Sequence, residues 1–238
     1  MKVLSIDSST ATAACAVIED GKLLGEMVLN DKKQHSVILM PIIDSLMNNL
    51  KLDIKDIDAF VVSSGPGSFT GLRIGMATAK GLAQANNKPF IGISTLDALA
   101  FNLAYTSGII CPILDALRDN VYTALYSFNK GSLERISDYM AVHIDELIPL
   151  IKEKAPNSVA FIGDAVSKFS EKLEKSFDSV YFAPAHLNLA RASSLGELGL
   201  VRLEEGHQDN LLTFSPIYIR KSQAEREYEN KTGVSINE

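Results

Sequence analysis

Short apolar segments alternate with polar turns along the first half of the chain, and their spacing predicts both strands and helices. Apolar residues that recur every three to four positions are typical of helices, whereas short continuous apolar runs bounded by turns are typical of buried strands. Asp20-Gly21 is a strong hairpin signal, because both central positions of a type I′ turn need positive φ. The expected elements are strands over 3–6, 13–18, 23–29, 59–64 and 90–93, and helices over 34–50, 70–85 and 96–104.

The second half of the chain repeats this order of elements. In each half three strands precede an alternation of helices and strands, so the order βββαβαβα occurs twice. Three antiparallel strands followed by such an alternation predict a mixed sheet with helices on its faces. The second set comprises strands over 111–114, 121–128, 133–140, 159–162 and 180–182, and helices over 143–154, 165–175 and about 191–205.

The repeat predicts an α/β protein of two tandem ribonuclease-H-like lobes, the architecture of actin-like ATPases and sugar kinases. We expect the first lobe at 1–105 and the second at 106–221, with the hinge near 105–108, where turn residues interrupt the periodicity. The last helix is a candidate to pack back on the first lobe. Residues 222–238 are charged and low in apolar content, so we expect a frayed tail there.

Composition narrows the possible classes of function. The 238 residues are 46% hydrophobic and 22% charged, as in an ordinary globular protein, which excludes wholesale disorder. No apolar run approaches the roughly 18 residues that cross a bilayer, and Asp7 interrupts the N-terminal apolar stretch, so we expect a cytoplasmic protein without a membrane partner. The net charge of −6 disfavours direct binding of nucleic acid, because lysine and arginine supply most of that affinity.

The turn after the first strand is a candidate ligand site. Asp7, Ser8 and Ser9 would face the cleft between the lobes, where they could hold phosphate or a hydrated metal ion. Such residues also bond their own backbone in tight turns, and this alternative is the favoured one. The corresponding turn of the second half, 115–119, contains no glycine. Glycine allows backbone to approach a phosphate closely, so its absence weakens the nucleotide interpretation.

A glycine-rich block between a predicted strand and a predicted helix is the sharpest local signature. Its residues allow unusual turns and can cap the following helix, so they fit either an anion site at the helix N-terminus or a rigid elbow. It is not a Walker A loop, because the G-K-[ST] ending is missing. The block comprises Gly65, Pro66, Gly67, Ser68, Thr70 and Arg73.

The helix after this block carries small residues every four positions, at Gly71, Gly75 and Ala79. A glycine inside a helix costs about 1 kcal/mol relative to alanine, so another backbone must approach this face closely. That backbone belongs either to the protein's own sheet or to another subunit. The helix over 37–50 is apolar on more than one face, and a single buried stripe needs only about 100° of its surface. The excess suggests a partner.

Searches for metal and nucleophile motifs find none. The four histidines are scattered, without the spacing that places two on one helix face, and there is no G-x-S-x-G elbow. Two cysteines lie in apolar runs and read as buried thiols.

Four segments together resemble the TsaB family, formerly called YeaZ. They are LSIDSS at 4–9, SGPGSFTGLRIG at 64–75, GISTL at 92–96 and PIYIR at 216–220. The resemblance implies a bacterial subunit of the machinery that makes threonylcarbamoyladenosine at position 37 of tRNAs reading ANN codons. It implies binding to the catalytic paralogue TsaD, recruitment of the ATPase TsaE, a homodimer in isolation, and contact with tRNA only through the complex.

The resemblance does not extend to catalysis. The paralogue holds its metal through a histidine pair on the helix that corresponds to 95–104 here, and this segment has no histidine. We therefore expect no catalytic residue and no cofactor, with ATP and metal on the partner subunits. The alternatives are an actin-like ATPase or kinase anchored on Asp7 and, more weakly, a peptidase. The resemblance places the helical interface on the two helices above, and we predict its residues as Ile38, Ile42, Leu46, Gly71, Leu72, Gly75 and Ala79.

Overall fold

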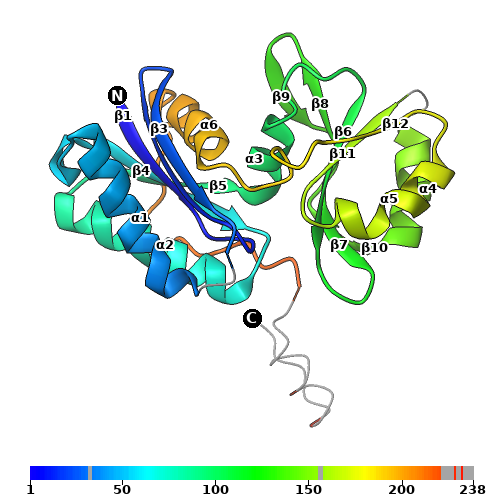
Figure 1. The fold of residues 1–238 in the computed structure, drawn as a ribbon, viewed down its shortest axis with the longest axis horizontal. Coiled ribbons are helices and arrows are strands. Elements are labelled where there is room, and N and C mark those ends of the chain that lie inside the picture. The colour runs from blue at the N-terminus through cyan, green and yellow to red at the C-terminus, as the bar shows by residue number, and fades with distance from the viewer. Residues whose placement is uncertain (32–33, 155–157, 221–227, 229–231, 233–238) are drawn as a thin grey trace.

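The computed structural model describes residues 1–31, 34–154, 158–220, 228 and 232. Two lobes, each built on one sheet, lie side by side (Figure 1). The first sheet has the order β3-β2-β1-β4-β5, in which β1, β2 and β3 are antiparallel and β4 and β5 run parallel to β1. Its strands are β1 (Lys2–Asp7), β2 (Ala13–Glu19), β3 (Lys22–Leu29), β4 (Ala59–Gly65) and β5 (Phe90–Ser94).

Helices cover both faces of the first sheet. On one face α1 (His35–Leu50) and α2 (Phe69–Asn86) bury a core with side chains from β1, β2 and β4. On the other face α6 (Ala192–Glu204) packs against β1 and β2, although it comes from the end of the chain. The chain then continues along the first lobe, so the last part of the region 106–221, expected to form the second lobe, lies on the first lobe.

The second sheet repeats the strand order of the first. Its path is β10-β7-β6-β11-β12. The first strand of the lobe, β6, is again central, and β11 and β12 run parallel to it. This repeated topology confirms the predicted α/β class and the tandem arrangement. The elements on this path are β6 (Ile109–Asp115), β7 (Asn120–Thr123), β10 (Met140–His143), β11 (Val159–Ile162) and β12 (Val180–Phe182), with helices α4 (Ile144–Lys154) and α5 (Val166–Ser176).

Two predicted strands of the second lobe are each broken in two. The expected strand 121–128 is β7 followed by β8 (Tyr126–Asn129), and the expected strand 133–140 is β9 (Ser132–Arg135) followed by β10. At the break, Leu125 donates its backbone N–H to the Ser137 hydroxyl at 2.8 Å instead of to a neighbouring strand. A side chain thus replaces one rung of the ladder, and β7 and β8 pair with opposite ends of β6.

The short helix α3 (Thr95–Phe101) joins the two lobes. It ends three residues before the predicted limit, and its apolar face packs with second-lobe residues such as Ile110 and Tyr126. None of the helices in the described part of the chain is long and apolar enough to cross a membrane. The expected frayed tail, 222–238, lies outside the described residues apart from Tyr228 and Thr232.

Candidate functional site

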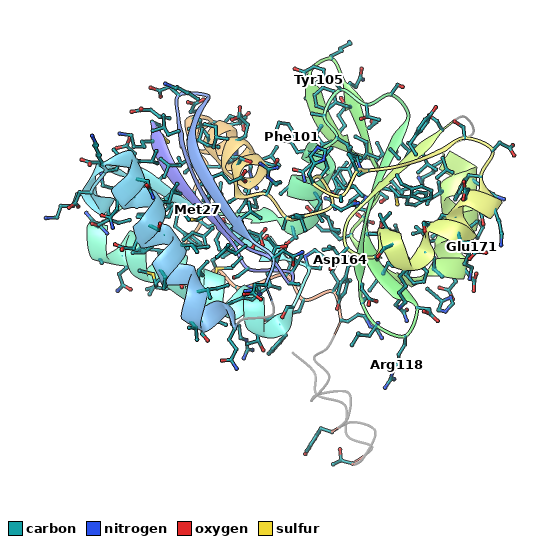
Figure 2. All side chains as sticks on the ribbon, viewed as in Figure 1. Met27, Phe101, Tyr105, Arg118, Asp164 and Glu171 are labelled. Carbon is teal, nitrogen blue, oxygen red and sulfur yellow. The ribbon has the colours of Figure 1, made fainter. Side chains whose placement is uncertain are left out.

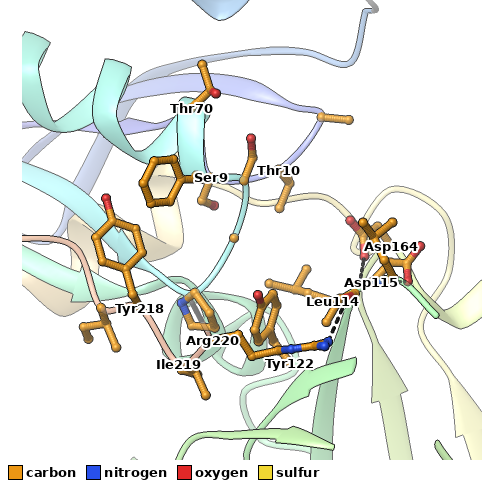
Figure 3. A pocket seen from close by; sticks show the side chains of 18 of the residues that line it. Ser9, Thr10, Thr70, Leu114, Asp115, Tyr122, Asp164, Tyr218, Ile219 and Arg220 are labelled. Carbon is orange, nitrogen blue, oxygen red and sulfur yellow. Dashed lines mark hydrogen bonds between the residues drawn. The ribbon is translucent and has the colours of Figure 1, made fainter. Parts of the chain in front are cut away.

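A pocket of about 560 Å³ opens between the lobes. Its first-lobe wall is the turn after β1 and the N-terminus of α2, and its second-lobe wall is the turn after β6 (Figure 3). Residues 217–220, near the C-terminus, close a third side. The polar side chains around it include Ser9, Thr10, His35, Ser68, Thr70, Asp115, Tyr122, Asp164, Tyr218 and Arg220.

Of the three candidate residues after β1, only Ser9 lines this pocket. Asp7 and Ser8 are completely buried. The Oδ1 atom of Asp7 accepts bonds from the Ser9 N–H at 2.8 Å and the Ser9 hydroxyl at 2.7 Å, and burial raises the pKa of this carboxyl. The expectation that Asp7 and Ser8 face the cleft is therefore wrong, because both side chains are turned into the protein. Asp7 Oδ1 and the Ser8 hydroxyl bond within the chain, whereas Asp7 Oδ2 is buried without a hydrogen-bond partner among the described residues.

The second-lobe wall of the pocket is acidic. The Asp115 N–H donates to the Asp164 carboxylate at 2.9 Å, and burial together with the charge of Asp115 raises the pKa of Asp164. Figure 2 shows Asp164 at the inner edge of the second lobe and Arg118 at the outer end of the turn. The Lys168 ammonium pairs with Asp115 at 3.4 Å, so Asp164 is the carboxyl of this wall that opposes a phosphate group. Its charge weighs against a nucleotide phosphate in the pocket.

The turn after β6 adopts the backbone conformation of a glycine turn without glycine. Leu117, Arg118 and Asp119 have φ of 64°, 53° and 56°. Side chains hold it: Asp115 accepts from the Leu117 N–H at 3.0 Å, and Asn120 donates to the Arg118 carbonyl at 2.8 Å. Close approach of a phosphate to this turn would need bare backbone, and the side chains of Leu117, Arg118 and Asp119 occupy it instead.

The contacts of the glycine-rich block are those of a rigid elbow between β4 and α2, the second of the two interpretations offered above. A Cβ atom at Gly67 would lie within 3.0 Å of the Ser9 carbonyl oxygen, and the Ser68 N–H donates to that oxygen at 2.6 Å. The Ser68 hydroxyl caps α2 by accepting from the Gly71 N–H at 3.2 Å. Gly65, with φ of 101°, makes the turn out of β4, before Pro66.

Two other residues of the block face outward. Thr70 is exposed at the pocket, where Pro66 also contributes to the lining. The guanidinium of Arg73 lies 3.9 Å from the centre of the Phe69 ring and its Nε donates to the Tyr218 hydroxyl at 3.1 Å. Arg73 therefore binds the protein's own aromatic side chains.

The small-residue stripe of α2 faces the protein's own interior. A Cβ atom at Gly71 would lie within 3.0 Å of the Ser8 carbonyl oxygen, and one at Gly75 within 3.0 Å of the Ser8 hydroxyl. Ala79 is buried, and Leu72 is only 1% exposed. The predicted partner interface is thus wrong for these four residues, because the backbone that approaches α2 is the turn after β1.

The facing residues of α1 are interior as well. Ile38, Ile42 and Leu46 belong to the core cluster that includes Ala79, and each is less than a tenth exposed. Most of the apolar side chains of α1 therefore pack in the lobe's own core. The prediction that Ile38, Ile42 and Leu46 lie in a partner interface is wrong too.

The outer face of the same two helices is open to solvent. On α1, Val37 is 64% exposed and Met40 is 48% exposed. On α2, Ala77 and Gly81 are exposed, and a Cβ atom at Gly81 would have no atom within 4 Å. Gly81 is a glycine inside α2, and Met40 belongs to the helix expected over 37–50, whose apolar excess the sequence shows. No inward-facing contact accounts for them.

Within the described residues, no group of three or more histidine, cysteine, aspartate or glutamate side chains is placed to hold a metal ion. Cys15 and Cys111 are both buried free thiols, and burial raises the pKa of each to about 12.

The chain is similar in sequence to proteins of known families. The family model of the tRNA N6-adenosine threonylcarbamoyltransferase TsaD matches residues 22–228. The tRNA threonylcarbamoyladenosine biosynthesis protein TsaB of Bacillus subtilis is 34% identical over 229 residues, covering 96% of this chain and 98% of the relative. TsaB of Escherichia coli is 24% identical over 94% of this chain and 96% of its own length.

Solved structures share the fold. YeaZ from Pseudomonas aeruginosa superimposes with a TM-score of 0.76 at 20% identity, covering 91% of this chain and 99% of that protein. A second P. aeruginosa structure, described as similar to peptidase YeaZ, gives a TM-score of 0.78 at 20% identity over 92% and 99% of the two chains.

Proposed function

We propose, because this chain belongs to the TsaB family of tRNA threonylcarbamoyladenosine biosynthesis proteins, that it acts as the non-catalytic scaffold of a TsaD-type transferase. Its role as a subunit in threonylcarbamoyladenosine biosynthesis follows from that membership. In the proposal a TsaE-type ATPase joins the pair, tRNA binds through the complex, and ATP and metal lie on the partner subunits.

The outer face of α1 and α2 is the proposed docking surface for the transferase. The observation that carries it is Gly81, an exposed glycine inside α2 with open space around its Cα. Such a glycine costs the helix about 1 kcal/mol relative to alanine, and packing within this chain does not require it. A partner helix that approaches closely at Ala77 and Gly81 explains the missing side chain.

Apolar side chains on the neighbouring helix support this docking surface. Val37 and Met40 are exposed on α1, which lies beside α2 on the same face of the sheet (Figure 1). Methionine adapts its shape and is common at binding surfaces. In the proposal the homodimer uses the same surface, so the homodimer and the complex with the transferase exclude each other.

The absence of catalysis is also part of the proposal. Asp7 is buried and bonded to Ser9, so it would have to leave its turn to anchor a metal ion in the pocket. Asp115 is paired with Lys168, and the Asp164 carboxylate beside it would repel phosphate. Both features support a scaffold over an ATPase or a kinase.

A pair of charge substitutions tests the docking surface. Met40→Glu places a carboxylate in the proposed interface, and Val201→Glu does the same at a comparably exposed apolar position on α6. We expect Met40→Glu to weaken binding to the TsaD-type protein by about tenfold or more, which is about 1.4 kcal/mol, and Val201→Glu to leave it unchanged. Titration calorimetry measures both, and equal affinities for the two variants would place the interface elsewhere.

A reconstitution tests the assigned role. The purified protein is combined with the TsaD-type and TsaE-type proteins, tRNA, ATP and threonylcarbamoyl-adenylate, and each component is omitted in turn. Loss of modified tRNA when this protein alone is left out supports the scaffold. Undiminished modification without it contradicts the proposal.

A further inference from the structure

After α6 the chain runs along the edge of the first lobe as a strap, residues 209–220 (Figure 1). It is anchored first at β5. The Asp209 N–H donates to the Phe90 carbonyl at 2.8 Å, and the Asp209 carboxylate accepts from the Gly92 N–H at 2.8 Å. The Phe214 ring packs against Phe90 with centroids 5.4 Å apart and fills the space where Gly92 has no side chain.

The strap next runs along α2. The Lys80 ammonium donates to the Phe214 carbonyl at 2.6 Å, and about three helical turns away the Phe69 and Tyr218 rings lie 4.8 Å apart. Arg73 closes the contact by covering Phe69 and donating to the Tyr218 hydroxyl. Residues 73 and 80 are seven positions apart, so the strap holds one side of the helix over two turns.

The strap finally crosses to the second lobe. Its Ile217 N–H donates to the Ser64 carbonyl at 2.7 Å, and the Arg220 guanidinium donates to the Ala116 carbonyl at 3.1 Å, in the turn after β6. Tyr218 and Arg220 stand on the same wall of the pocket (Figure 3). Both ends of the strap are therefore tied to sites other than α2.

The inner face of α2 gives a physical reason why this helix needs bracing. Gly71, Gly75 and Ala79 contribute at most one side-chain carbon each, so the apolar burial of α2 depends on a few larger residues such as Leu72 and Met76. Gly81 further weakens the helix. Large side chains of the strap supply from the flank the contact area that the small residues lack.

We propose that the strap positions α2 for docking, with Tyr218 and Arg73 as positioning residues that fix the helix. This inference rests on the proposed function, because it assigns to the strap the alignment of the docking surface that includes Ala77 and Gly81. In this proposal the strap residues, which lie near the C-terminus, control the affinity for the partner through the position of α2.

Hydrogen exchange and partner affinity, measured on one set of variants, test the proposal. The set comprises Tyr218→Ala, Tyr218→Phe, which keeps the ring on Phe69, and Tyr181→Ala, an exposed tyrosine of the second lobe. We expect Tyr218→Ala to speed amide exchange in α2 about tenfold while leaving α5 unchanged, and to weaken binding to the TsaD-type protein several-fold. Tyr218→Phe should restore most of the protection, and Tyr181→Ala should match the wild type.

The outcomes separate the strap from the docking surface. Unchanged exchange in α2 of Tyr218→Ala overturns the bracing role. Faster exchange with unchanged affinity, while Met40→Glu still weakens binding, overturns the positioning role alone. If Tyr218→Ala exchanges faster but both Tyr218→Ala and Met40→Glu bind with full affinity, the docking surface is wrong, and so is the positioning role that depends on it. If Tyr218→Ala does not fold, Arg73→Ala replaces it, because Arg73 is exposed and contacts the same ring.

Discussion

The Ser8 hydroxyl lies against the Cα of Gly75, in the space that any larger side chain at position 75 would need. The same hydroxyl donates to the Gly71 carbonyl at 2.8 Å, so α2 sits directly on the turn after β1. This contact between backbone and side chain explains why α2 tolerates two glycines that each cost helix stability.

Substitution of the inner glycines should therefore affect the fold. Gly75→Leu overpacks the contact with the Ser8 side chain and displaces its hydroxyl from the Gly71 carbonyl, and such changes typically cost about 1–3 kcal/mol. Gly81→Ala, at the open position, should stabilise the isolated protein by up to about 1 kcal/mol. Urea unfolding measures both. A folded, wild-type-stable Gly75→Leu variant would show that α2 can leave the turn without cost.

Asp97 links the two lobes, and its contribution to the free energy of unfolding depends on pH. It accepts from the Tyr126 hydroxyl at 2.7 Å and from the Tyr139 hydroxyl at 2.9 Å, both in the second lobe. Burial raises the pKa of Asp97 above its ordinary 3.8. Between the ordinary and the raised pKa the folded protein holds a proton that the unfolded chain has lost, so stability falls as pH rises through this window.

Two substitutions separate the charge from the hydrogen bonds. Asp97→Asn keeps an acceptor for the tyrosines and should flatten this pH dependence, at little or no cost near neutral pH. Asp97→Ala leaves two hydroxyls unpaired and should cost about 1–3 kcal/mol. Urea unfolding between about pH 4 and about pH 7 checks both, and equal losses in the two variants would contradict the explanation.

Glu26 of β3 contributes stability with the opposite pH dependence. Its carboxylate accepts from the Ser193 N–H at 2.9 Å and from the Arg191 Nε at 2.9 Å, and so caps α6 from the sheet. Burial pushes the pKa of Glu26 up, but the bonds from Arg191 and Ser193 outweigh it and hold the pKa below the ordinary 4.5. This stability is present above the unfolded pKa and is lost as pH falls through the folded pKa.

Glu26→Gln should accordingly destabilise the protein near neutral pH by about 1–3 kcal/mol, because it removes the charge from these bonds. Below pH of about 4 the difference from wild type should shrink. Thermal unfolding across this range is the measurement. A constant difference at all pH values would mean that the carboxylate charge contributes nothing.

The isolated protein should turn over neither ATP nor peptides, with or without added divalent metal. The reason is the inward-turned side chain of Asp7 and the carboxyl of Asp164 at the pocket. Phosphate release and peptide cleavage assays measure this directly. ATP turnover that disappears in Asp7→Asn would instead establish an enzyme.

One wall of the pocket could be placed from the sequence, but the other walls could not. Ser9 and Thr70 line it in segments that the sequence singled out as candidate turns and caps. Tyr122, Asp164 and Tyr218 come from segments far apart in the chain, and no local pattern relates them. The strap could not be predicted from the sequence either, because its anchors on Gly92 and Arg73 lie more than a hundred residues earlier in the chain.

The sequence by itself determined most of the elements and their repeated order, because strand and helix periodicity are properties of neighbouring residues. The breaks between β7 and β8 and between β9 and β10 depend on a contact with Ser137 that no local pattern shows. The helix expected over 34–50 is α1, at His35–Leu50, and the Asp20-Gly21 hairpin has φ of 46° and 75°. The tertiary structure alone decided what the stripe at Gly71, Gly75 and Ala79 packs against. Small residues in a helix report that a backbone comes close, but the chain must fold before it is known which backbone that is.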